Sequence, residues 1–264
     1  MPKAVACHRR ARVRVARLLF GGPRRNERGT GLCTIRENTG LPGVISRPGA
    51  LNLTLHNNYI AQGARVSERS DGIVPDHSLT GGAGWAYGTA PWLESGAYLP
   101  IYTVTQDRQL RFDGAEIRAL FVVPHAERLP FFYGLNLAFG FHSSAFDAQP
   151  LTAEIRPIVG ARLGLLRVTF NPVLETTFDG FANINFSPAT LADYTLSSRW
   201  SIALEHYAEL GTLHRFAAAA DQRHELFFVT DYAREALSIE AGVGRGLTQA
   251  SDDLTFKLIV SRDL

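Results

Sequence analysis

His142 is followed directly by Ser143 and Ser144, a grouping that places a potential general base beside two hydroxyl nucleophiles. Acyl-transfer catalysis needs this pair together with a third group that orients the base. The flanking residues carry no known hydrolase motif, and a histidine beside serines at the end of a strand is also ordinary loop composition. We therefore assign no catalytic residue and do not expect an enzyme.

The sequence signals for metal binding and for nucleotide binding are equally weak. His206, His214 and His224 lack a recognised ligand spacing, although two of them flank a polar stretch where weak surface metal binding is an alternative. Cys7 and Cys33 stand outside any ligand pattern. The glycines of residues 242–246 lie within a strand pattern with no helix after it, so we interpret them as making room. We predict no metal and no cofactor.

Charged side chains recur at alternate positions inside otherwise apolar segments. Facing inward around a cavity, they would form a lining of mixed sign, which in a pore sets ion and solute selectivity. Alternatively, pairs such as Glu154 and Arg156 would cancel across neighbouring strands and close the passage. The lining candidates are Glu116, Arg118, Glu154, Arg156, Arg162, Arg167, Glu175, Glu205, Glu209, Asp231, Glu240 and Lys257.

Residues 129–142 show most clearly which elements would position these charges. Apolar residues occupy one parity throughout, and small or polar residues such as Gly134, Asn136 and His142 occupy the other. Strict alternation predicts a β-strand with one apolar face. Its length favours a membrane span, because soluble strands average about 5–6 residues whereas a tilted spanning strand needs roughly 9–11.

The same alternation recurs along the chain from Ala50 and predicts twelve strands. Pro157 and Pro172 interrupt two of them on the apolar parity, which we interpret as bulges. The predicted strands span residues 51–59, 78–88, 92–102, 111–123, 129–142, 152–163, 165–178, 182–195, 199–210, 223–232, 236–247 and 252–264.

Connections between the predicted strands alternate between tight turns and longer loops. The two longest are residues 63–77 and 211–222, and both fall on the same side of the pattern. Trp92, Phe131, Tyr194, Trp200 and Tyr232 lie near the tight turns, as an interfacial aromatic girdle would. An even strand count, one rim of short turns and paired first and last strands are typical of outer-membrane barrels. We therefore predict an all-β fold, a single antiparallel transmembrane β-barrel of about twelve strands.

Charge divides the chain into two unlike parts. Residues 1–47 carry eleven Lys or Arg against two Glu, whereas residues 48–264 carry sixteen basic and twenty-three acidic residues. The head lacks the 7–15-residue apolar core of a signal peptide. We expect residues 1–47 to be a disordered basic head or a mis-called start, with a nucleic-acid-binding arm as the alternative. Residues 48–264 form the predicted barrel domain.

Several segments resemble a family of uncharacterised bacterial outer-membrane proteins that are labelled putative transporters. They are residues 50–59 (ALNLTLHNNY), 73–79 (IVPDHSL), 92–100 (WLESGAYLP), 118–124 (RALFVVP), 131–136 (FFYGLN), 154–160 (EIRPIVG) and 242–252 (GVGRGLTQASD). The family is distantly similar to the meta-pathway phenol-degradation outer-membrane proteins. The resemblance covers about residues 43–264 and implies an outer-membrane barrel, without identifying a substrate or site residue. Family members begin with a secretory signal, which is not evident here.

Function follows from the fold prediction only in outline. We expect an outer-membrane channel or transporter for small solutes, surrounded by outer-membrane lipid and without a nucleic-acid partner. A closed structural or interaction barrel, whose long loops bind a partner, is the alternative. A lipid-acting enzyme is the third. The sequence indicates no oligomeric state.

Overall fold

The computed structural model describes residues 45–67, 72–146 and 149–264, which form one antiparallel sheet. Two short 3-10 helices, Phe181–Asn183 and Ala219–Asp221, lie in the connections. No helix in the described residues is long and apolar enough to cross a membrane. The strands are β1 (Leu51–Gln62), β2 (Ser78–Ala90), β3 (Leu93–Val104), β4 (Leu110–Val122), β5 (Phe131–His142), β6 (Leu151–Leu163), β7 (Leu166–Asn171), β8 (Leu174–Thr176), β9 (Asn185–Phe186), β10 (Ala189–Thr195), β11 (Trp200–Glu209), β12 (Gly211–Thr212), β13 (Arg215–Phe216), β14 (Arg223–Arg234), β15 (Leu237–Gly246) and β16 (Leu254–Asp263).

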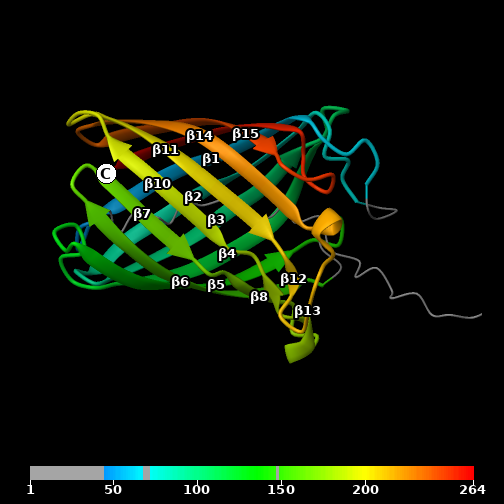
Figure 1. Ribbon diagram of the computed structural model, residues 1–264, viewed down its shortest axis with the longest axis horizontal. Coiled ribbons are helices and arrows are strands. Elements are labelled where there is room, and N and C mark those ends of the chain that lie inside the picture. The colour runs from blue at the N-terminus through cyan, green and yellow to red at the C-terminus, as the bar shows by residue number, and fades with distance from the viewer. Residues whose placement is uncertain (1–44, 68–71, 147–148) are drawn as a thin grey trace, which may run out of the picture.

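These strands close into a twelve-stranded barrel, as predicted (Figure 1). β7 with β8 makes one barrel strand and β9 with β10 another, while β12 follows β11 and forms a short hairpin with β13. Each barrel strand pairs with its sequence neighbours, and β1 pairs with β16 from Asn52 opposite Asp263 to Gln62 opposite Leu254. Closure pairs the edge strands β1 and β16, which hydrocarbon surroundings require because an unpaired sheet edge cannot be hydrated there.

Burial in the wall is inverted relative to a soluble protein. In β5 the Phe131 side chain is 60% exposed and its neighbour Phe132 is fully buried. The same alternation continues to the far end of β5, where Phe141 is exposed and His142 is buried. The apolar parity therefore lies outside the barrel and the polar parity lines its interior. A soluble sheet with a buried apolar face is excluded by this arrangement.

The two rims of the barrel differ. We call the end with the tight connections at residues 91–92, 164–165 and 235–236 the turn rim, and the opposite end the loop rim. The C-terminus lies at the turn rim, and the long loops extend from the loop rim (Figure 1). The second long loop is more ordered than predicted, because it holds the β12–β13 hairpin and a 3-10 helix. Trp92, Tyr194 and Trp200 are exposed near the turn rim, as predicted for a girdle.

The bulges predicted at the wall prolines are wrong. β6 pairs with β7 through Val159 opposite Phe170 and with β8 through Ile155 opposite Leu174, with the same offset on both sides of the break. That offset places Pro157 opposite Pro172 without an inserted residue.

A third proline continues this row onto the next barrel strand. Asn171 pairs with Ala189, and Leu174 pairs with Phe186, which places Pro188 beside Pro172. Since proline has no N–H to donate, the ladder lapses there, and these two barrel strands are each divided in two.

Candidate functional site: the charged barrel interior

The twelve lining candidates lie on the polar parity of their strands, opposite in direction to the exposed apolar side chains. Most of them are engaged in ion pairs along or across strands. Arg118 Nη2 lies 2.7 Å from Glu94 Oε1, Arg156 Nε lies 2.8 Å from Glu154 Oε1, and Arg167 Nη2 lies 3.4 Å from Asp193 Oδ1. Their role in permeation stays a prediction. Glu94 was not among the candidates. Its proximity to Arg118 becomes visible only when β3 and β4 are placed in register, with Gly96 opposite Arg118.

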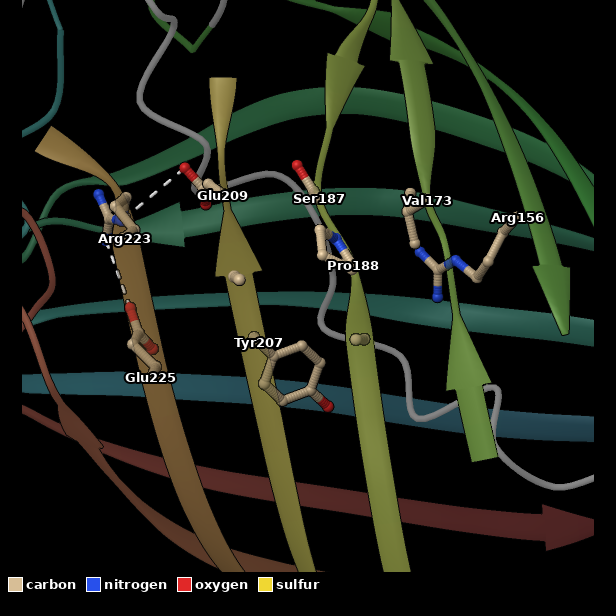
Figure 2. Close-up of a pocket in the computed structure, with 10 residues that line it drawn as sticks. Arg156, Val173, Ser187, Pro188, Tyr207, Glu209, Arg223 and Glu225 are labelled. Carbon is tan, nitrogen blue, oxygen red and sulfur yellow. Dashed lines mark hydrogen bonds and ion pairs between the residues drawn. The ribbon is translucent and has the colours of Figure 1, made fainter. Parts of the chain in front are cut away.

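Arg223, at the loop end of β14, has three carboxylate neighbours. Its Nη2 lies 2.8 Å from Asp252. The same Nη2 lies 3.5 Å from Glu225, and Nε lies 3.9 Å from Glu209 (Figure 2). All four side chains are largely shielded from solvent. The sequence prediction included only Glu209 of this group. Arg223 begins β14 and Asp252 lies two residues before β16, so their proximity depends on how the strands are registered across the wall.

A second cluster lies deeper in the barrel and is centred on Lys257. Its Nζ contacts Glu205 of β11 and Glu240 of β15, and the Tyr207 hydroxyl donates a 2.9 Å hydrogen bond to Glu205. Lys257 and Glu205 are almost completely buried, at 1% and 2% side-chain exposure. A buried ammonium group needs carboxylates that balance its charge. Removing either the ammonium or a carboxylate would leave an uncompensated charge in the interior.

Glycines of β15 make the second cluster possible. A Cβ added to Gly244 would lie 2.3 Å from the Phe227 ring, and one added to Gly242 would lie 2.9 Å from Val229. Lys257 Nζ lies 5.7 Å from the centre of the same Phe227 ring. The interpretation that these glycines make room, rather than bind a nucleotide, is supported by this packing.

A pocket opens beside Arg223. Register explains its composition, because Glu209 and Arg223 are paired, as are Tyr207 and Glu225 in the adjacent row. Arg156 lies on the other side of the pocket from Arg223, with Tyr207 between their strands (Figure 2). Apolar side chains, including Val173, Pro188, Ala189 and Ala208, complete the lining.

An apolar cluster occupies the interior near the turn rim. Leu120, Val122, Ala126, Phe132 and Ile158 form a buried apolar cluster there, and Ile45 packs against it. The Ser46 backbone N–H and hydroxyl both donate to Glu94, at 2.7 and 2.9 Å. A Cβ on Gly88 would meet the Arg47 carbonyl oxygen at 2.1 Å, so only glycine lets this segment cross the inner face of the wall.

His142 occupies the interior at the loop rim and joins three strands. Its Nδ1 lies 3.2 Å from Asp113 Oδ2, and its Nε2 lies 3.1 Å from Thr152 Oγ1. The three side chains are buried on β4, β5 and β6. Sequence analysis missed Asp113 and Thr152 as partners, although the hairpin register that brings them together could have indicated both. This arrangement stabilises the junction of the three strands, since buried polar groups need partners.

The remaining histidines do not gather into a predicted metal centre. His206 and His224 lie on adjacent strands, with Nε2 and Nδ1 3.2 Å apart and their rings stacked. His214 is exposed in the second long loop. Within the described ranges, no group of three or more His, Cys, Asp or Glu side chains could hold a metal ion.

Comparisons with known proteins place the fold. No family model matches the chain, and no curated protein matches it. The solved structure of the COG4313 outer membrane channel from Pseudomonas putida F1 aligns over 85% of this chain and 99% of its own, with TM-score 0.59 and 10% identity. The NanC porin aligns over 80% of this chain and 100% of its own, with TM-score 0.55 and 8% identity.

A third solved structure agrees. The KdgM porin aligns over 80% of this chain and 98% of its own, with TM-score 0.53 and 12% identity. The fold is that of outer-membrane barrels. At these identities the similarity concerns the fold alone. None of the three structures is described as a phenol-degradation protein, so that part of the sequence resemblance stays a prediction.

Proposed function

We propose that the protein resides in the outer membrane and forms a passive, non-enzymatic channel for small solutes. The observation that carries this proposal is the combination of an apolar outer wall with an interior lined by charged and polar side chains. A purely structural barrel has no need of ionised groups inside, because apolar packing would fill it without the cost of desolvating charges. The similarity in fold to solved channels and porins supports the same conclusion.

A closed interaction barrel is the second candidate, and one observation favours it. The apolar cluster around Phe132, with Ile45 packed against it and Ser46 bonded to Glu94, occupies the interior near the turn rim. In this alternative the ion pairs fill the interior, and the loops at residues 63–77 and 211–222 contact a partner.

Conductance of the full chain in planar lipid bilayers separates the two candidates. The protein is first refolded into detergent micelles, and barrel closure is checked by different migration of boiled and unboiled samples on a gel. A channel produces discrete current steps and allows small sugars to swell liposomes. A heat-modifiable barrel that gives neither current steps nor swelling would contradict the channel proposal and favour the interaction barrel.

A further inference from the structure

We propose that the interior prefers cations, both inorganic monovalent ions and small primary ammonium solutes, and that an acidic track on one wall sets this preference. The inference rests on the proposed channel function and specifies its substrate class. The acidic track consists of Glu209, Glu225, Glu205, Asp231 and Glu240, on strands β11, β14 and β15.

Register places these carboxylates in successive rows along the barrel axis. Glu209 lies in the row of Arg223 at the loop end, Glu225 lies one row deeper opposite Tyr207, and Glu205 lies in the next row opposite Phe227. Asp231 and Glu240 are paired with each other two rows further toward the turn rim. Rows on one face of a strand are separated by two residues, or about 6.6 Å. The five carboxylates therefore follow one another along one wall, from the loop end toward the turn rim.

Cationic side chains of the interior do not offset this track. Arg223 is shared by three carboxylates, and Lys257 by two. On the inward parity of the described wall, acidic side chains outnumber basic ones. The acids include Glu94, Asp113, Glu116, Glu154, Glu175, Asp193, Glu205, Glu209, Glu225, Asp231, Glu240 and Asp263, with Asp252 just before β16, and the bases include Arg111, Arg118, Arg156, Arg162, Arg167, Arg223 and Lys257.

Excess negative charge between low-dielectric walls concentrates cations and excludes anions, because the field is focused into the aqueous space. On the opposite wall, Arg118 contacts Glu94, Arg156 contacts Glu154, and Arg167 lies 3.4 Å from Asp193. On β11, β14 and β15, the five carboxylates of the acidic track are accompanied by Arg223 and by Lys257 of β16. A solute carrying a positive charge would follow that wall.

An independent observation also points to a donor or cationic ligand. Asn136 Oδ1 and Asn171 Oδ1 have no hydrogen-bond partner in the described part of the chain, although both residues are more than nine-tenths buried. Both lie on the inward parity, and the Asn171 row continues through Ala189 to Tyr207 and Glu225 at the pocket. An amide oxygen only accepts hydrogen bonds or coordinates cations. These oxygens thus suit ammonium groups and hydrated cations.

The test is ion selectivity of the full chain in bilayers that separate two KCl concentrations. We expect the reversal potential to report K⁺ permeability several-fold above Cl⁻ permeability. The variant Glu209→Gln/Asp231→Asn should reduce that ratio toward one, and Glu209→Lys should shift it further toward Cl⁻. Among the three carboxylates around Arg223, Glu209 is the most distant. Asp231 accepts a hydrogen bond from Ser201. Both changes therefore leave the shorter ion pairs intact.

Glu235→Gln is the matched control, because Glu235 is an exposed acid in a turn outside the interior. It should leave the permeability ratio unchanged. Conductance with equal or higher Cl⁻ permeability, or an equal response to Glu235→Gln, would overturn the cation inference and leave the channel proposal standing. A heat-modifiable barrel without conductance would overturn both. Heat modifiability of each variant confirms that a changed ratio does not arise from misfolding.

Discussion

Lys257 of β16 contacts Glu205 of β11 across two intervening barrel strands, β14 and β15. Between them β15 presents Gly242 and Gly244, where an added Cβ would meet Val229 and the Phe227 ring beside the contact. The ion pair therefore ties four barrel strands together on their inner side. It links the closing strand of the barrel to the wall that carries the acidic track.

Replacing Lys257 by Met should destabilise the barrel strongly. The change leaves the Glu205 and Glu240 carboxylates buried without their cation, and removal of one partner from a buried pair costs about 3–5 kcal/mol. Urea unfolding in lipid vesicles measures the loss. The variant Lys257→Met/Glu205→Gln should regain part of it, because one buried charge is removed. A Lys257→Met barrel as stable as the wild type would show that the pair is hydrated and weak.

Adding a methyl group at Gly244 should also destabilise the fold. The new Cβ would lie 2.3 Å from the Phe227 ring, and overpacking of this kind costs about 1–3 kcal/mol. Unfolding of Gly244→Ala measures this cost, and Gly244→Ala/Phe227→Leu should recover stability because the ring is removed. Equal stability of Gly244→Ala and the wild type would contradict the close packing of ring and backbone.

The outer wall should reject charge according to depth. Leu258, exposed on the outer face midway along β16, should cost about 2–4 kcal/mol when replaced by Arg, as expected near the bilayer midplane. Leu264, beside the turn rim, is the control position, where the same change should cost about 0–1 kcal/mol. Unfolding in vesicles of defined thickness gives both values. Equal costs at the two positions would contradict a membrane-embedded outer face.

Backbone protection should be weakest where the proline row crosses the wall. Residues 156–158 and 171–173 lie between paired segments but are themselves outside the ladder between β6 and β7/β8. Hydrogen exchange measured by mass spectrometry in nanodiscs should therefore be faster there than in the middle of the β14–β15 pair, which is continuous. Uniform protection around the barrel would show that other groups complete the ladder at the prolines.

Strand count, face assignment and closure could be predicted from sequence because each follows from alternation with a period of two. Alternation places Phe131 and Phe132 on opposite faces of the strand. The length of the segment favours a membrane span and so indicates that Phe131 lies outside and Phe132 inside. Contacts across the interior could not be predicted. The pairing of Lys257 with Glu205 depends on the registers of three successive strand pairs, and a shift in any of them would separate the two groups.

The prolines show the same limit at shorter range. Pro157 and Pro172 each look like a local defect in their own strand, and their opposition becomes visible only once both strands are registered. His142 is a similar case. Sequence adjacency indicated Ser143 and Ser144 as its neighbours, whereas the sheet supplies Asp113 and Thr152 from adjoining strands. Residues 1–44, which carry most of the predicted basic head, lie outside the described residues.

The pairing of β1 with β16 has a consequence for the order of folding. Asn52 and Asp263 are partners in space although they are 211 positions apart along the chain, whereas most other neighbours in the wall belong to local hairpins. Closing so large a loop carries the greatest entropic cost, so this seam should form after the hairpins have assembled. Until then the growing sheet has two unpaired edges, and the seam is the step at which assembly either completes the cylinder or leaves it open to other chains.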